Sequence, residues 1–446
     1  PAPGAEPEPA APAAEPIEAA PQRVYLVERI AFTGLSHVKA WAARRHVVVA
    51  EGAPLDEFKV VVSRLRLLQL GWFSRVETRL EKGSARGLVV LVFDVTERNT
   101  LVVSDLVVGS TRPQPVYGGL GLTQQNFLGE GLGLSGAFAY GGSPLGRPGD
   151  PDRFALRGAF FAPDVGVAGQ RFVAGASALW LRGEELACAD PSCDAHAGRF
   201  GDAPRLRYQR AGGEVSAGVR TGPFERVTAG LRWERIRAEA IAGPSGPEGP
   251  VPPVLLGHSN LAALTATWEL DSRDDRFFPT EGLLSLAQIT FASKLLGSDY
   301  EYSRYLFQLE SGFGLFGQPL RLQGLVGAAQ GGAPFFERFY AADLSYFAVG
   351  PALGRAMELN FSTDSRYDAF AAMGGLEYGV PLWSRGAFFH RGYLAFGARA
   401  VYTSATLGGG RTHASRWPVS FDVALRVDTP VGTFNASLGA ALDNAL

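Results

Sequence analysis

Apolar and polar residues alternate with a period of two through most of the chain after Glu97. Within residues 264–271, for example, one face of an extended strand carries Leu264, Ala266, Trp268 and Leu270, and the other face is polar or charged. We interpret the polar face as the inner one. Charged residues inside and apolar residues outside invert a water-soluble sheet, which is the arrangement of a β-barrel that stands in lipid around a polar lumen.

Fifteen such strands can be marked between residues 100 and 442, and their connections alternate in length. Short breaks, such as those at residues 128–130 and 429–430, alternate with long ones, such as 183–204 and 331–369. Short turns on one rim and long loops on the other are typical of bacterial outer-membrane barrels. We therefore assign residues 99–446 to a membrane β-barrel of about 16 antiparallel strands, of which 15 are readable. The charged residues predicted to face the lumen are Arg232, Glu234, Glu269, Asp271, Arg304, Glu310, Arg321, Glu377, Arg399, Asp422 and Arg426.

The N-terminal part follows a different pattern. Residues 1–22 are rich in Pro, Ala and Glu, so we expect a flexible tether. Residues 23–98 predict a compact α+β domain: a strand over residues 24–34, helices around 38–48 and 55–70, and strands over 74–80 and 88–96. Gly71 is the predicted stop of the second helix.

Composition excludes several classes of function. The net charge is −2 and only 19% of residues are charged, which gives no electrostatic basis for nucleic-acid binding. The six histidines form no metal-binding pair, and no phosphate-binding loop or nucleophile elbow occurs, so we expect no enzyme activity and no cofactor. No apolar run is long enough for a membrane helix. The chain opens on Pro1 without a signal peptide, and we therefore expect a processed, exported protein.

The chain has two cysteines, Cys188 and Cys193, which lie in a polar loop in the sequence CADPSC. A zinc site would need more ligands than the nearby His196 supplies. A disulfide that closes this short loop is the better interpretation, and it suits an envelope protein. Because the closed loop is short, its contribution to global stability should be small.

Several motifs resemble one family when taken in order. The N-terminal unit, with its LGWF sequence at residues 70–73 and its last strand ending near Glu97, resembles a polypeptide-transport-associated (POTRA) domain. Residues 125–131 (QNFLGEG), 271–282 (DSRD followed by PTEG), 374–382 (GGLEY followed by PL) and 429–432 (TPVG) resemble motifs of the outer-membrane assembly and translocation superfamily of the BamA and TamA type.

The resemblance implies an outer-membrane barrel with one POTRA domain in the periplasm. It also implies protein insertion: the POTRA sheet edge captures clients by β-augmentation, and the clients enter the bilayer through a seam in the barrel. The expected partners are client outer-membrane or secreted polypeptides, the lipid bilayer, and periplasmic or lipoprotein accessory subunits. Two alternatives stay open, namely a polypeptide export pore of the two-partner-secretion type and a structural paralogue that scaffolds an envelope complex. The N-terminal domain argues against a passive porin.

The chain departs from the family in its sixth long loop. Members carry an Arg-Gly-aromatic motif there, folded back into the lumen. Here the aromatic frame of Phe339 and Phe347 remains, but Ser345 and Tyr346 stand where Arg-Gly is expected. Arg338 or Arg355 is a candidate replacement cation, and the alternative is ordinary aromatic packing. Since a loop cation needs carboxylate partners, we predict that Glu377 and Asp422 anchor the loop.

The first and last strands should form the seam. The family implies a sixteenth strand, and we expect it beyond Leu446, with a partner chain completing the wall as the alternative. The first strand contains Leu101, Val103, Asp105 and Val107 and is apolar on both faces except at Ser104 and Asp105, as the sequence of residues 100–109 shows. Burial alone therefore specifies its register weakly, and we predict that a client strand pairs there.

Overall fold

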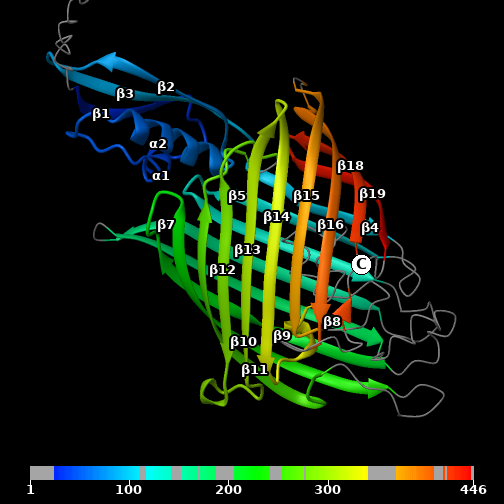
Figure 1. The fold of residues 1–446 in the computed structure, drawn as a ribbon. Coiled ribbons are helices and arrows are strands. Elements are labelled where there is room, and N and C mark those ends of the chain that lie inside the picture. Colours follow the sequence, from blue (N-terminus) through cyan, green and yellow to red (C-terminus); the bar gives the residue numbers. More distant parts are fainter. Residues whose placement is uncertain are drawn as a thin grey trace, which may run out of the picture.

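The computed structural model describes residues 25–109, 117–141, 152–167, 170–186, 205–241, 253–275, 278–339, 368–384, 386, 388–405, 415–416 and 419–442. These residues form a small sheet-and-helix unit and one large curved sheet (Figure 1). The predicted tether and several predicted site residues lie outside the described residues: Cys188, Cys193, Ser345, Tyr346, Phe347 and Arg355. The predictions for them stay predictions.

The N-terminal unit has the predicted order of elements: β1 (Leu26–Thr33), α1 (Ala40–Arg44), α2 (Glu57–Gln69), β2 (Phe73–Lys82) and β3 (Leu88–Glu97). Strand β3 lies in the centre, parallel to β1 and antiparallel to β2. The Asp56 side chain caps α2 by accepting the Lys59 N–H at 3.2 Å, and Gly71, with φ of 73°, follows the helix.

Helix α1 is shorter than the predicted helix over residues 38–48. Val47 and Val49 follow it in irregular chain and belong to the buried core of the unit, together with Leu67, Trp72 and Phe93. Packing into this core therefore overrides the apolar spacing that predicted a longer helix. No helix in the described part of the chain is long and apolar enough to cross a membrane.

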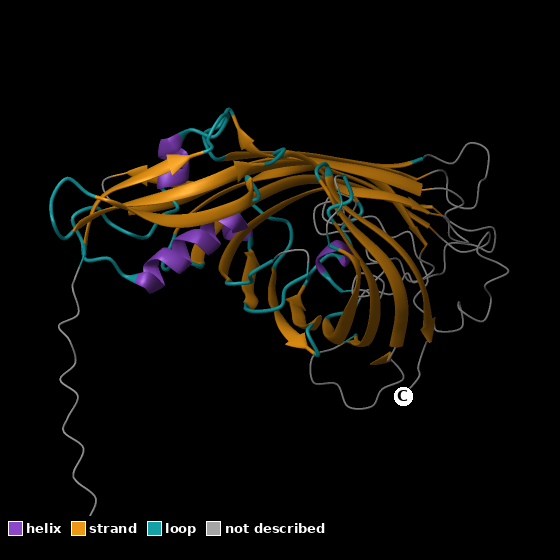
Figure 2. Cartoon of the chain, turned by 90° about the horizontal axis from the view of Figure 1, so that it is seen from above, coloured by secondary structure: helices purple, strands orange, loops and turns teal. Residues whose placement is uncertain are grey.

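Each of the fifteen predicted strands is present in the large sheet, with bounds close to those expected. They are β4 (Leu101–Gly109), β5 (Tyr117–Phe127), β6 (Leu132–Gly141), β7 (Arg153–Val167), β8 (Gln170–Leu186), β9 (Arg205–Val219), β10 (Glu225–Ile241), β11 (Gly257–Asp271), β12 (Leu283–Ala292), β13 (Tyr302–Leu315), β14 (Gln318–Gly331), β15 (Phe370–Trp383), β16 (Arg391–Ser404), β18 (Val419–Thr429) and β19 (Gly432–Leu442). A two-residue strand, β17 (Ser415–Arg416), pairs with the end of β16 in the same register as β18 and precedes it along the chain. From β4 to β19 the long strands pair with their neighbours along the chain in antiparallel ladders, and the sheet curves around an interior (Figure 2).

Strand β10 shows why the sheet takes this orientation. Its side chains alternate strictly: Leu231 is 46% exposed and Trp233 is also exposed, whereas Glu234 is 3% exposed and Arg232 is largely covered. The predicted inversion is thus confirmed, with apolar residues outside and charged residues inside. Beyond Glu234 the alternation of exposed and buried residues continues, but the chemistry of the two faces reverses. Arg235 and Arg237 are exposed, while Ile236 and Ala238 are buried. The reversal marks the edge of the outward apolar belt.

The alternation predicts a polar interior throughout. The structure differs, because part of the interior is apolar. At the end of the sheet that carries the long loops, small and aromatic side chains from many strands form a buried inner layer, which includes Tyr208, Ile236, Leu261, Tyr300 and Tyr302. The short helical turn η4 (Phe335–Glu337), which follows β14, contributes Phe335 to this layer. Charged residues share the interior with this layer: Glu184 and Arg210 are buried at the same end, and Glu310 and Glu377 lie nearer to the short turns.

The two ends of the sheet meet without forming a ladder. In a sheet of strands that run alternately up and down, the first and the fifteenth are parallel, and β4 and β19 are indeed parallel. They share one register pair, Gly432 with Val103, and one hydrogen bond, from the Val103 N–H to the Val431 carbonyl at 2.7 Å. The sheet therefore falls short of the closed barrel that the alternation predicts, because no antiparallel ladder joins its first and last described strands.

Candidate functional site

The seam between β4 and β19 is the first candidate site. On its other side β4 pairs with β5 over its whole length: Val103 opposes Leu122, Asp105 opposes Gly121 and Val107 opposes Gly119. The register shifts between Val103 and Asp105, which is a β-bulge. Leu101 and Leu106 are both exposed although they have opposite parity in the sequence, so the strand exchanges faces at the bulge. The sequence did not predict this, since both faces of the strand are apolar.

Glycine allows the one close approach at the seam. Gly432 has φ of 140°, and a Cβ atom there would lie 2.3 Å from the Val103 carbonyl oxygen. Apart from this point, neither edge has a ladder partner among the described residues. Unpaired backbone groups on a sheet edge template the addition of another strand. Because β4 and β19 run in the same direction, one added strand between them could run antiparallel to both.

The second candidate site is a charged cluster on the inner face of β14, β15, β16 and β18. Glu377 is 2% exposed, and its Oε2 accepts hydrogen bonds from Arg321 at 2.7 Å and Arg426 at 2.8 Å. Arg399 donates to Gln323 at 2.6 Å. The alternation had placed these charged residues in the lumen, and the structure brings them into one network.

Asp422 lies in the same row as Glu377, with Gly397 of β16 between them. It is 3% exposed, and a Cβ atom on Gly397 would lie 2.4 Å from its Oδ1, so the carboxylate extends over the glycine. Neither oxygen of Asp422, nor Oε1 of Glu377, has a hydrogen-bond partner among the described residues. A buried carboxylate without donors is costly, and these oxygens are therefore suited to a cation. This geometry is compatible with the predicted anchoring role, which it does not test.

The start of the sixth long loop folds inward. Phe339 is buried, its ring fills the space left by Gly327, and the Arg304 guanidinium lies 4.9 Å from the ring centre. Arg338, one candidate for the loop cation, donates instead to the Ala333 carbonyl at 3.0 Å. The other candidate, Arg355, lies outside the described residues.

Sequence reasoning missed the anchor nearest to this loop. Glu337 pairs with Arg232 of β10, which also donates to the Tyr302 hydroxyl at 3.0 Å. Next to it, the Arg210 guanidinium lies 3.9 Å from the centre of the Phe336 ring. Here a loop carboxylate meets wall cations, the reverse of the arrangement predicted at Glu377 and Asp422. The sequence signal is Glu337 itself, a charged residue that directly follows the aromatic pair Phe335 and Phe336.

The joint between the N-terminal unit and the large sheet is a third site. The Trp72 indole N–H donates to the Gln125 carbonyl at 3.0 Å, and its ring packs on Gly131, where a Cβ atom would lie 2.8 Å away. The Lys39 N–H donates to the Gly129 carbonyl at 3.1 Å, and its ammonium pairs with Glu130. Gly129 and Gly131 have φ of 74° and 78°, which glycine adopts readily in a tight turn. These two glycines also leave room for the N-terminal unit, and the sequence did not predict this contact.

His46 lies buried behind this joint, edge-on to the Trp72 ring. Burial lowers the pKa of His46 well below its usual range, and the positive charges of Arg220, Arg66, Arg171 and Arg45 lower it further. Two of these arginines, Arg171 and Arg220, belong to the β7–β10 region of the large sheet. The imidazole is therefore neutral at ordinary pH, and it packs as an aromatic ring.

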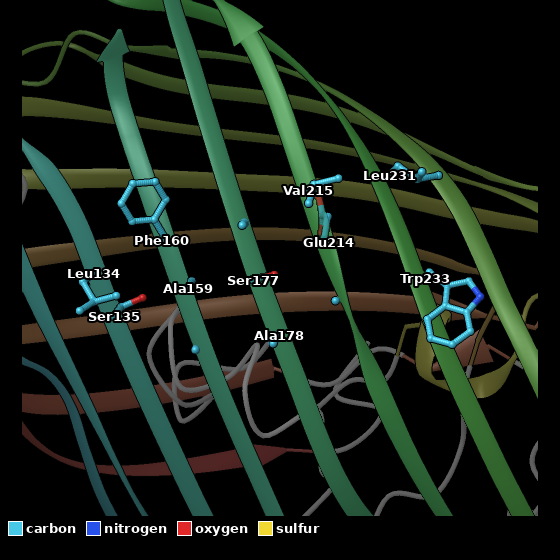
Figure 3. Close-up of a pocket in the computed structure, with 13 residues that line it drawn as sticks. Leu134, Ser135, Ala159, Phe160, Ser177, Ala178, Glu214, Val215, Leu231 and Trp233 are labelled. Atoms are coloured by element: carbon cyan, nitrogen blue, oxygen red, sulfur yellow. The ribbon is translucent and has the colours of Figure 1, made fainter.

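A hollow of about 590 Å³ lies on the outer surface of β6 to β10 (Figure 3). Its walls are exposed apolar side chains, including Leu134, Phe160, Val215, Leu231 and Trp233. Glycine and alanine residues of the intervening row leave the space between them. It belongs to the outward apolar belt, and Glu214 is the one ionisable residue among those that line it.

Comparison with known proteins places the fold. Residues 126–445 match the model of the Omp85 superfamily domain. Among solved structures, CdiB from Escherichia coli has 11% identity and a TM-score of 0.62 over 94% of this chain and 73% of that chain. CdiB from Acinetobacter baumannii has 10% identity and a TM-score of 0.54 over 94% and 71%. BamA from Haemophilus ducreyi lacking POTRA domains 1–3 has 17% identity and a TM-score of 0.49 over 95% and 82%. No curated protein matches the sequence.

Proposed function

This chain belongs to the Omp85 superfamily of outer-membrane proteins, and we propose that it inserts client polypeptides into the outer membrane through the seam between β4 and β19. The observation that carries the proposal is the near absence of pairing between these strands, which share one register pair. An edge of unpaired N–H and C=O groups at the level of the bilayer is costly, and a client strand that pairs with it removes that cost.

The N-terminal unit would act as a POTRA domain in the periplasm and deliver clients. Its sheet has the order β1-β3-β2, so β1 and β2 are edge strands. Most β2 side chains are exposed. An extended client segment can therefore add to an edge by main-chain hydrogen bonding, with little dependence on its sequence. Accessory periplasmic or lipoprotein subunits would bind on the same side.

The lumen carboxylates would hold the inward loop. Glu377 and Asp422 present three unpartnered oxygens among the described residues, and the Arg355 guanidinium is the cation that we propose for them. Such a charge-assisted contact would fix the loop against β15 and β18, next to the seam strand β19. No cofactor is needed for this mechanism, because the free energy of insertion comes from the folding of the client itself.

The proposal is tested by locking the seam. After Cys188 and Cys193 are replaced by serine, cysteines at Val103 and Val431 are joined by a short thiol-reactive crosslinker, since their backbones are hydrogen-bonded at 2.7 Å. We expect the locked protein to stay folded and to lose insertion of a model client into vesicles, because β4 and β19 can then no longer part to admit a client strand.

The matched control locks a ladder away from the seam. Ala229 and Ala266 are outward-facing partners on β10 and β11, and crosslinked cysteines there should leave insertion unchanged. Normal insertion by the seam-locked protein would rule out this mechanism. The export pore and the structural paralogue would then remain as the alternatives.

A further inference from the structure

The connection between β11 and β12 does not simply turn at the rim, because it folds inward and contacts distant strands. We propose that its described residues, 272–275 and 278–282, form a brace that transmits the position of the N-terminal unit to the seam, with Gln69, Asp275 and Arg391 as positioning residues. The inference rests on the proposed function and adds to it the means by which the seam is held closed.

One end of the brace is attached to the N-terminal unit. The Gln69 side chain, at the end of α2, donates to the Arg273 carbonyl at 2.6 Å and to the Asp271 carbonyl at 3.4 Å. Arg273 is held in turn by two hydrogen bonds to Asp271, of 2.9 and 3.0 Å, and by one to Glu310 of β13 at 2.8 Å. A shift of α2 therefore acts on a segment that is fixed to the barrel wall.

The middle of the brace is stiff. The Asp274 carboxylate accepts N–H groups of Asp275, Thr280 and Glu281 at 2.9 to 3.2 Å, and the Thr280 hydroxyl at 2.6 Å. These bonds tie the two described stretches together. Pro279 packs where a Cβ atom on Gly312 of β13 would lie 2.6 Å away, so glycine makes room for the segment against the wall.

The far end reaches β15, β16 and β18. Asp275 forms an ion pair with Arg391 of β16. The Phe278 ring packs against the Tyr393 ring with their centres 4.4 Å apart, lies against Gly379, and has the Arg426 guanidinium 5.3 Å from its centre. The brace therefore connects β11 with the strands that lead to the end of the sheet.

From there, direct contacts continue to the seam. Arg391 donates to Asp428 at 3.0 Å, and Asp428 precedes the turn between β18 and β19. In that turn the Thr429 hydroxyl donates to the Gly432 carbonyl at 2.8 Å. The Val431 carbonyl then accepts the Val103 N–H, which is the backbone hydrogen bond across the seam. Each step from Gln69 to Val103 is a hydrogen bond, an ion pair or adjacent chain.

The test measures seam opening without a client. In a background with both native cysteines replaced by serine, one cysteine at Val431 reports the opening through its rate of maleimide labelling in the folded full-length protein. We expect Asp275→Asn to raise that rate by roughly 2- to 30-fold, the range of measured coupling effects between sites. Asp275→Glu, which keeps the charge, should restore most of the wild-type rate. Glu269→Gln is the matched control, since it breaks a comparable inner ion pair with Arg226 that is not on this path.

A second variant tests the attachment to the N-terminal unit. Gln69→Ala removes hydrogen bonds to two carbonyls and should fold even if Asp275→Asn does not. It should also speed labelling, but adding it to Asp275→Asn should change little, because both act through one connection. Labelling of Asp275→Asn at the rate of Glu269→Gln would overturn the brace, and so would independent, multiplying effects of the two variants. Faster labelling with unchanged client insertion would support the brace and contradict the proposed insertase function.

Discussion

Glu97 illustrates how one side chain can organise a domain. Its carboxylate accepts the backbone N–H groups of Ser36 and Val38 at 2.8 Å and the Ser36 hydroxyl at 2.7 Å. Burial by itself would raise the pKa of Glu97, but these hydrogen bonds and that of the His37 N–H outweigh it and lower the pKa to about 2. The loop before α1 is therefore tied to the end of β3 only while Glu97 is ionised.

We accordingly expect this contribution to stability to be complete above pH 4.5, the ordinary value for a glutamate, and to be lost as the pH falls towards about 2. Between these values the unfolded chain binds the proton more readily than the folded one, so acid favours unfolding. Acid titration of the full chain in vesicles, followed by tryptophan fluorescence, should show a shallower loss for Glu97→Gln than for the wild type. Glu77→Gln, which removes an exposed carboxylate of β2, should titrate like the wild type.

Single residues are also where sequence reasoning was least complete. Glu377 and Asp422 could be named because alternation places charged residues on one face and a loop cation needs carboxylates. The pairing of Glu337 with Arg232 could not be named, since it joins residues 105 apart in the chain through the inward path of a loop. Periodicity carries no information about such a path.

At the scale of the element, β10 makes the inversion testable. Leu231 faces outward in the apolar belt, and Thr228, three residues earlier, faces the interior. Leu231→Arg should cost about 2–4 kcal/mol near the middle of the bilayer, because the guanidinium must enter lipid. Thr228→Arg should be tolerated. Equilibrium unfolding in vesicles with a denaturant measures both, and equal stabilities would contradict the assignment of faces.

Strands were the elements that the sequence predicted best. A period of two is clear in most of the fifteen, and each break contains glycine, proline or charged residues that end a strand. The bulge after Val103 and the inward β11–β12 connection were not predictable. Both depend on contacts with distant strands, and in β4 the two faces are too alike for the sequence to show where they exchange.

At the scale of the whole molecule, the N-terminal unit and the sheet meet at two turns on one rim. The β5–β6 turn receives Trp72, which is 1% exposed, and the β11–β12 connection receives Gln69. The family resemblance identified both sequences as motifs of the barrel, but it did not predict that they are the docking points of the other domain. In the proposed mechanism docking and insertion are linked, since the second of these turns leads to the seam.

Gly131 allows this docking to be tested without touching the brace. A methyl group there would lie 2.8 Å from the Trp72 ring, in a residue whose φ is 78°. We expect Gly131→Ala to displace the indole and to expose the link that begins at Arg98, whose N–H donates to the Trp72 carbonyl at 2.9 Å. Tryptic cleavage after Arg98 should then be faster, while the barrel keeps its heat-modified migration on gels.

Control substitutions at two other glycines distinguish the effect of the Trp72 contact from the effect of backbone strain at a positive φ. Gly52→Ala introduces a side chain at φ of 80° with no atom within 4 Å, so it carries the strain alone. Gly133→Ala, in β6, adds a methyl at ordinary contact distance from Phe161 and carries neither burden. If the Trp72 contact holds the N-terminal unit on the barrel, tryptic cleavage after Arg98 should be much faster in Gly131→Ala than in either control variant. The same cleavage rate in Gly131→Ala and Gly52→Ala would contradict this role of the tryptophan contact.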